Sequence, residues 1–286
     1  EAFANGLGGI ANRLSREQRY PGASRVRTSS RTAAGVAITP DTAVTVPAVW
    51  ACLRFLSPTV GVLPWRVMRK AAGGGGSINA PSHPADWLIY KRPNPEWSSF
   101  QFREALTHWA LRWGNGYAEI ERDGYGRAIA MWPLHPDRVE VCRDPETREL
   151  YYEITGGAAG EPKIEIPYRD MFHVRGFGEG PVGVNVIHYA AESIGWAKAA
   201  QIFGASFFGN GANVSGIVTM KKKLTPEGLE RAKEQFAGLY KGVRNASKTA
   251  FLDNDMDWKS VGIDPDKAQF ILTHQHLVEE ICRWFG

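Results

Sequence analysis

The chain has 286 residues, 43% of them hydrophobic and 22% charged, and its formal net charge is +4. These values predict a globular protein with a sizeable core, and a net charge this small argues against a dedicated nucleic-acid binder. No run reaches the roughly 20 apolar residues of a membrane span and no secretory segment follows the start, so we expect no membrane contact. Only three cysteines occur, far apart, which indicates a reducing compartment and neither a disulfide framework nor a thiolate metal site: Cys52, Cys142 and Cys282.

Residues 1–41 predict a flexible, Arg-rich N-terminal arm. Residues 1–40, which are rich in Gly and Ser, contain only the two acidic residues Glu1 and Glu17 but six arginines: Arg13, Arg16, Arg19, Arg25, Arg27 and Arg31. Organelle transit peptides share this composition, but no amphipathic helix is evident, so we interpret the arm as a solvated tail. Because residue 1 is Glu and the chain stops just after a helix, we also expect a fragment or a processed product.

Residues 42–184 predict an α+β body with an antiparallel sheet. Hydrophobic periodicity and turn residues indicate helices over residues 47–62 and about 99–113, and strands over residues 63–69, 117–122, 128–133, 138–143, 151–155 and 170–175. Ser98 or Ser99 is expected to cap the second helix, and Gly114, Asn115 and Gly116 to end it.

Gly178, Gly180 and Gly183 spell G-x-G-x-x-G between an expected strand and an expected helix, as a dinucleotide-binding turn would. However, Pro181 occupies a variable position, the preceding strands are expected to be antiparallel, and no acid lies about 20 residues beyond to hold a ribose. We interpret the glycines as a hinge where the chain turns sharply.

Two long helices bracket a small insert, which predicts a projecting stalk with a tip. The first covers residues 185–208 and is rich in small residues such as Ala191 and Gly195, which let another backbone come close. The second opens with Asp264 as N-cap and Pro265 as its first residue. Its apolar stripe includes three candidate packing residues: Phe270, Leu277 and Ile281.

The insert, residues 214–263, reads as strand, helix and strand with oppositely charged edges. Its basic edge consists of Lys221, Lys222 and Lys223, and its acidic edge of Asp253, Asp255 and Asp257. Solvated loops explain this pattern about as well as function does. In a ring of identical subunits, the two edges would meet their neighbours' opposites.

The sequence offers no catalytic signature. It contains no phosphate-binding loop, no HExxH zinc helix and no GxSxG nucleophile turn. His274 and His276 lie two apart on a helix and point to different faces, so a shared metal is not expected. We expect no enzyme, no cofactor and no metal.

From about Thr42 to its end the chain resembles the portal proteins of tailed bacteriophages, of the HK97 type. The resemblance spans some 240 residues, and its specificity lies in the shared order of several stretches. These are VPAVWACLRFLSPTVGVLPWRVMR, the RPNP turn, WGNGYAEIERD, MWPLHPDRV, MFHVRG, ASFFGNGANVSGIV, LTPEGLERAKEQF, DPDKAQF and EEICRWFG.

The resemblance implies a portal-like α+β fold and a non-enzymatic homo-oligomeric ring, usually a dodecamer, at one capsid vertex. It implies a wing at 42–184, stem helices at 185–213 and 264–286, and a clip at 214–263, with the chain ending before the tunnel loop and crown. Double-stranded DNA would pass through the axis during packaging and ejection, while the clip meets the terminase large subunit and later the head-to-tail adaptor. The implied location is the virion, beside the major capsid protein, and the host cytoplasm during assembly.

DNA contact is expected to be weak and non-specific, because a channel lined continuously with cations would hold DNA instead of letting it slide. The Lys and Asp residues of the insert are candidates for DNA or partner contacts. Two other functions stay open: a nucleotide-binding enzyme that uses the glycine motif, and a monomeric adaptor or DNA-binding module that uses the Arg-rich arm and the lysines.

Overall fold

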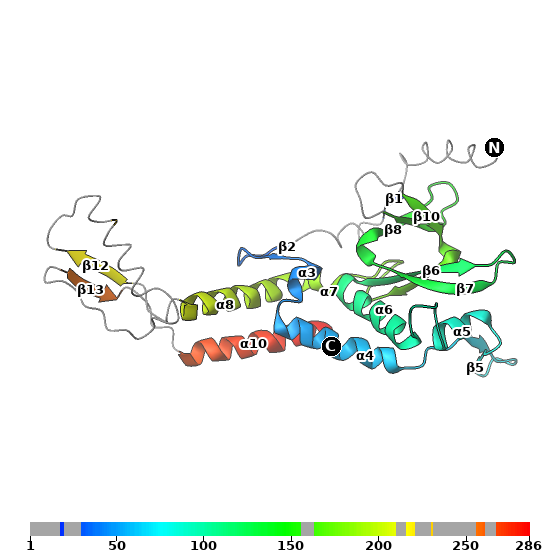
Figure 1. The fold of residues 1–286 in the computed structure, drawn as a ribbon, viewed down its shortest axis with the longest axis horizontal. Coiled ribbons are helices and arrows are strands. Elements are labelled where there is room, and N and C mark those ends of the chain that lie inside the picture. Colours follow the sequence, from blue (N-terminus) through cyan, green and yellow to red (C-terminus); the bar gives the residue numbers. More distant parts are fainter. Residues whose placement is uncertain are drawn as a thin grey trace.

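The computed structural model describes residues 18–19, 30–155, 163–209, 216–220, 230, 256–260 and 267–286. In the described part, two antiparallel sheets flanked by helices form a body, and two long helices run side by side away from it (Figure 1). The helices of the body are α3 (Pro40–Ala43), α4 (Pro47–Val62), α5 (Pro84–Tyr90) and α6 (Ser99–Trp113), with the 3-10 turns η1 (Pro136–Arg138) and η2 (Tyr168–Asp170).

Within the described residues the strands form two larger sheets and three two-stranded ladders, and all of these pairings are antiparallel, as expected. The four-stranded sheet has the order β1 (Gln18–Arg19), β8 (Val139–Arg143), β9 (Leu150–Ile154), β10 (Ile164–Pro167). The three-stranded sheet has the order β11 (Met171–Arg175), β6 (Asn115–Arg122), β7 (Ala128–Leu134). The ladders join β2 (Ser30–Arg31) with β3 (Ala37–Ile38), β4 (Met68–Lys70) with β5 (Ser77–Asn79), and β12 (Gly216–Met220) with β13 (Met256–Ser260).

The limits of α6 agree with the sequence expectation. The Ser98 hydroxyl accepts from the Gln101 backbone N–H at 3.2 Å, and the Gln101 side chain accepts from the Ser98 N–H at 3.1 Å, which completes a capping box. The helix ends at Gly114, whose φ of 84° is the left-handed conformation that glycine adopts without steric cost.

The first long helix differs from the single helix expected over residues 185–208. Asn185 caps a short helix, α7 (Val186–Tyr189), and Ala190, with φ −83° and ψ 5°, separates it from α8 (Ala191–Gly209). These dihedrals lie in the bridge region instead of the helical one, so the regular helix is interrupted at Ala190. The second long helix is α10 (Lys267–Phe285), and the expected cap residues Asp264 and Pro265 lie outside the described residues.

Two further expectations need correction. The strand expected over residues 63–69 begins only at Met68, because the Val67 N–H donates to the Asp86 carboxylate at 2.9 Å instead of to a neighbouring strand. The flexible arm expected over residues 1–41 does not include residues 30–38. There β2 and β3 form a hairpin on the body, in which Thr32 and Ile38 are buried.

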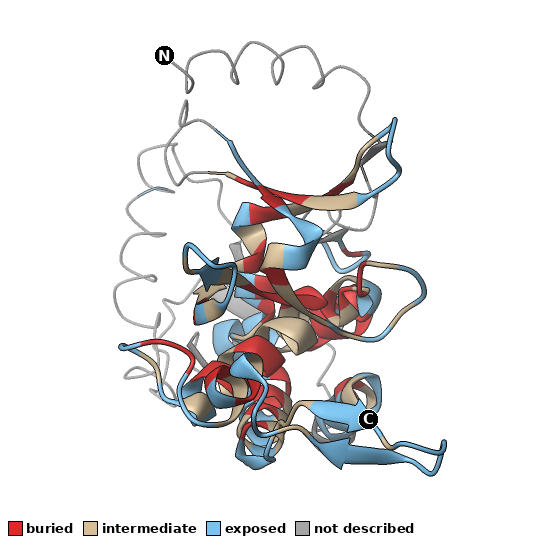
Figure 2. Ribbon diagram, turned by 90° about the vertical axis from the view of Figure 1, so that its right-hand side faces the viewer, coloured by how far each residue is buried: buried red, intermediate tan, exposed pale blue. Residues whose placement is uncertain are grey.

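The core nearest the long helices joins α4, α7, α8, α10 and the β2–β3 hairpin. Figure 2 shows buried residues on the inner sides of the helices and between the sheets, with exposed residues at the hairpin tips. The cluster consists of Ile38, Ala43, Val46, Ala48, Val49, Leu53, Ile187, Ala190, Ala191, Ile194, Ala197, Leu277 and Ile281.

Gly195 allows the hairpin to lie directly on α8. A Cβ added at Gly195 would stand 2.5 Å from Thr32 Cγ2 and 2.6 Å from Thr32 Oγ1. We expect Gly195→Ala to push the hairpin off and to lower the free energy of unfolding by about 1–2 kcal/mol, although alanine favours the helix. Limited trypsin digestion should cleave faster at Arg31. Adding Thr32→Ala should partly restore protection, and unchanged digestion of Gly195→Ala would contradict the packing argument.

Candidate interaction surface and hinge

The helix α8 carries apolar side chains on two opposite sides. Its inner side, with Ala191, Ile194 and Ala197, is buried in the core cluster. Its outer side, which we call the α8 outer face, carries Trp196 and Phe203, seven residues apart. Trp196 is 47% and Phe203 55% exposed. Large apolar side chains that stay exposed on a helix whose other side is buried are typical of a contact surface, so the α8 outer face is a candidate interaction surface.

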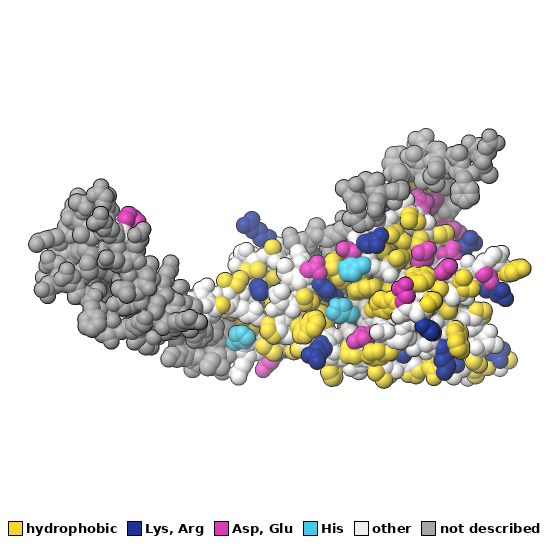
Figure 3. Space-filling model, in the orientation of Figure 1, with side chains coloured by type: hydrophobic (Ala, Val, Ile, Leu, Met, Phe, Trp, Pro, Cys, Tyr) yellow, Lys and Arg dark blue, Asp and Glu magenta, His cyan; other side chains and the backbone are white. Residues whose placement is uncertain are grey.

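The neighbouring helices add to this exposed apolar surface. On α4 the exposed large side chains include Trp50, Phe55 and Val62, and Phe55 is 70% exposed. On α10, Val278 and Trp284 are exposed as well. In Figure 3 hydrophobic side chains are interspersed with both signs of charge over the visible face of the described residues. Such a mixed surface suits a protein partner better than a polyanion.

α10 is tied to α8 by polar contacts as well as by the core. The Ser193 hydroxyl donates to the Glu280 carboxylate at 2.9 Å and accepts from the Trp284 indole N–H at 3.3 Å. These bonds orient the partly exposed Trp284 ring.

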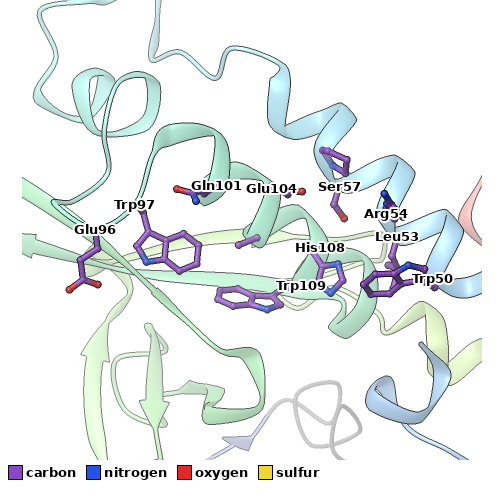
Figure 4. Close-up of a pocket in the computed structure, with 12 residues that line it drawn as sticks. Trp50, Leu53, Arg54, Ser57, Glu96, Trp97, Gln101, Glu104, His108 and Trp109 are labelled. Atoms are coloured by element: carbon purple, nitrogen blue, oxygen red, sulfur yellow. The ribbon is translucent and has the colours of Figure 1, made fainter. Parts of the chain in front are cut away.

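A cavity of about 520 Å³ lies between α4 and α6. Three indole rings, those of Trp50, Trp97 and Trp109, line it together with the charged side chains of Arg54 and Glu104 (Figure 4). An aromatic groove with charged groups beside it suits a peptide segment.

The junction between β6 and the first long helix is built from close backbone contacts. A Cβ on Gly183 would stand 2.1 Å from the Gly114 carbonyl oxygen and 2.8 Å from the Gly176 nitrogen. The buried Asn115 side chain accepts from the Gly183 N–H at 2.7 Å and donates to the Gly183 carbonyl at 3.1 Å. Asn115 therefore clamps the chain where it leaves the body for α7.

The same glycines made up the apparent dinucleotide motif. Gly178 and Gly180 have φ values of 135° and 90°, so the chain turns here through conformations that favour glycine. The strand before them, β11, runs antiparallel to β6, whereas a dinucleotide-binding turn follows a parallel strand. The hinge interpretation fits this geometry.

His173 supports the Asn115 clamp from β11. Because Asn115 Oδ1 is an acceptor, His173 Nε2–H donates to it at 2.9 Å, and His173 Nδ1 accepts from the Tyr152 hydroxyl at 3.2 Å. Burial, with a smaller effect of the nearby Arg175 guanidinium, lowers the pKa of His173 to about 4. The imidazole is therefore neutral at pH 7, as this hydrogen-bond pattern requires.

The lowered pKa predicts acid sensitivity. The unfolded chain takes up the His173 proton near pH 6.5 and the folded chain only near pH 4, so stability is fully present above pH 6.5 and is lost as the pH falls. The loss amounts to roughly 3 kcal/mol across this range. Urea unfolding at pH 7.5 and 4.5 should show a smaller difference for His173→Gln than for the parent. The exposed His276→Gln should behave like the parent, and an equal difference in all three would refute the assignment.

The candidate site residues fall into three groups. Lys221, Lys222, Lys223, Asp253 and Asp255 lie outside the described residues. Asp257 belongs to β13 and lies opposite Thr219 of β12, and Phe270 belongs to α10. The side chains of Asp257 and Phe270 are not among those that the structure describes. Leu277 and Ile281 are fully buried in the core cluster with α4 and α8. The Asn115 clamp was not predicted from the sequence. The Asn115–Gly116 pair directly after a helix is the feature that could have indicated it.

Among the residues that the structure describes, no three His, Cys, Asp or Glu side chains come together as they would to hold a metal ion. Nor does any helix there have the length and apolar character needed to cross a bilayer.

Comparison with known proteins gives consistent matches. A family model described as phage portal protein matches residues 47–286. The "Probable portal protein" of Streptomyces phage phiC31 is 33% identical over 265 residues, covering 89% of this chain and 56% of the phage protein. The chain thus spans a little over half the length of that relative.

Two solved structures share the fold. A crystal structure of an HK97 family phage portal protein from Corynebacterium diphtheriae matches with a TM-score of 0.61 at 15% identity, covering 90% of this chain and 76% of the other. The neck of a native gene transfer agent particle, computed with C12 symmetry, matches with a TM-score of 0.54 at 23% identity, covering 84% of this chain and 64% of the other. The expected portal-like α+β fold is confirmed.

Proposed function

The chain belongs to the phage portal protein family, and we propose that it forms a ring at one vertex of a capsid, through which double-stranded DNA is packaged and ejected. The observation that carries this proposal is the α8 outer face. It is a set of large apolar side chains on a helix whose other side is already buried, and a second copy of the chain would cover it. The C12 symmetry of the related neck supports a ring of twelve.

In such a ring, each subunit would consist of a wing at 42–184, stem helices at 185–213 and 264–286, and a clip at 214–263. The hairpin of residues 30–38 would join the wing. The clip would dock the terminase large subunit and then the head-to-tail adaptor, with its lysines and aspartates as contacts, and the wing would face the major capsid protein. The role is structural instead of enzymatic, and its place is the virion after assembly in the host cytoplasm.

The test combines negative-stain imaging with native mass spectrometry of the chain over a range of concentrations. Closed rings with an axial hole and one subunit number would support the proposal. A persistent monomer with salt-sensitive DNA binding would favour the monomeric adaptor instead. DNA affinity in the nanomolar range that resists salt would contradict a conduit through which DNA slides.

A further inference from the structure

Two of the three cysteines meet in the folded chain although 230 residues separate them. Cys52 lies on α4 and Cys282 on α10, and the Cys52 thiol donates toward Cys282 Sγ at 3.8 Å. Both are free thiols; Cys52 is half-buried and Cys282 is exposed. The spacing of the cysteines in the sequence gave no indication of this contact.

We propose that Cys52 and Cys282 are a redox modification site, a dithiol that a small-molecule disulfide converts into a bond fastening α10 to α4. The sulfur atoms need to approach by about 1.8 Å, from 3.8 Å to the bond length of about 2.05 Å. Side-chain rotation with a small shift between the two packed helices supplies a movement of this size.

The exposure of the two thiols sets the order of steps with oxidised glutathione as the oxidant. The Cys282 thiolate attacks one glutathione sulfur, the S–S bond of glutathione breaks, and one glutathione leaves as a thiolate. The Cys52 thiolate then attacks Cys282 Sγ and displaces the second glutathione. The protein loses two electrons and the two thiol protons, and glutathione disulfide gains them as two thiols.

The second step is expected to be the slow one. Burial and the hydrogen bond to Cys282 raise the pKa of Cys52 to about 11, so its thiol is protonated at neutral pH. The pair therefore stays reduced in a reducing cell interior and closes on longer exposure to an oxidising medium. Its biological value rests on the proposed function, because a virion passes from a reducing cytoplasm to an oxidising exterior.

Closure would link the C-terminal long helix covalently to the body. A disulfide that closes a loop of 230 residues strongly reduces the conformational entropy of the unfolded chain. We therefore expect Tm to rise by several degrees. It would also keep the base of α10 on α4 when force acts on the far end of the helix pair.

The experiment oxidises the folded chain with glutathione disulfide, blocks remaining thiols with a maleimide, and maps peptides by mass spectrometry. The expected product is a Cys52–Cys282 cross-link within one chain, faster migration on a non-reducing gel, and a higher Tm, all reversed by dithiothreitol. Cys142→Ala should behave like the parent. Cys52→Ser should retain a glutathione adduct on Cys282 without gaining stability.

The proposal fails if folded Cys52 and Cys282 stay reduced, carry separate adducts, or link only different chains. It also fails if Cys142 is the partner in the cross-link. The assay needs no ring and no DNA, so its failure leaves the portal proposal intact. Failure to form rings would likewise leave the cross-link result standing.

Discussion

The double variant Trp196→Glu, Phe203→Glu is expected to remain monomeric at concentrations where the parent chain forms rings. Both side chains belong to the α8 outer face and are exposed in the single chain, so the substitutions should lower its free energy of unfolding far less than a substitution in the buried core would. In the ring, each Glu would replace a buried aromatic by a charge without a partner. The loss of two aromatic anchors costs at least about 4 kcal/mol per interface, or roughly a thousand-fold in affinity.

The matched control is Tyr125→Glu. Tyr125 is 88% exposed, and it lies in the turn between β6 and β7, outside the long helices. Native mass spectrometry should show rings for Tyr125→Glu and monomers for the double variant, while circular dichroism shows both folded. Intact rings in the double variant would mean that α8 is not a subunit contact.

Gly183→Ala is expected to destabilise the chain by about 3 kcal/mol or more. The added Cβ would lie 2.1 Å from the Gly114 carbonyl oxygen, and backbone atoms at such a crossing have little freedom to move aside. A displaced Gly183 would also deprive the buried Asn115 amide of its two hydrogen bonds to Gly183. The clamp would then fail to hold the start of α7 on the body.

Urea unfolding measures this effect, with Gly124→Ala as the control. Gly124 lies in the β6–β7 turn, and its added Cβ would meet nothing within 4 Å. Its variant should stay within about 0.5 kcal/mol of the parent. If Gly183→Ala matched Gly124→Ala, the close crossing of the chain at Gly183 and Gly114 would not be a determinant of stability.

Much of the secondary structure follows from local sequence. The helix over residues 47–62 and the helix ended by Gly114 agree with the structure, because periodicity, capping side chains and glycine conformation act within a few residues. The expected secondary structure was wrong where contacts with residues far away in the sequence determine the local conformation. The Val67 N–H donates to the Asp86 carboxylate instead of to a strand, and the helix is interrupted at Ala190 inside the buried cluster.

The candidate site was less predictable than the fold. The sequence indicated an apolar stripe on α10, but it did not reveal that Trp196 and Phe203 of α8 would be exposed. That exposure depends on which side of α8 faces α4 and α10. Likewise, the buried Glu153 and its ion pair with Lys163 at 2.6 Å carry no local signature.

By itself the sequence determined the family, the α+β class and the two long helices, since each rests on patterns that are local or shared in order along the chain. Only the tertiary structure decided that Cys52 meets Cys282, that Gly183 crosses Gly114, and that Trp196 and Phe203 of α8 are exposed. These features join segments far apart in the sequence. Their distances follow from how the helices and sheets pack together, and no local pattern of residues encodes that packing.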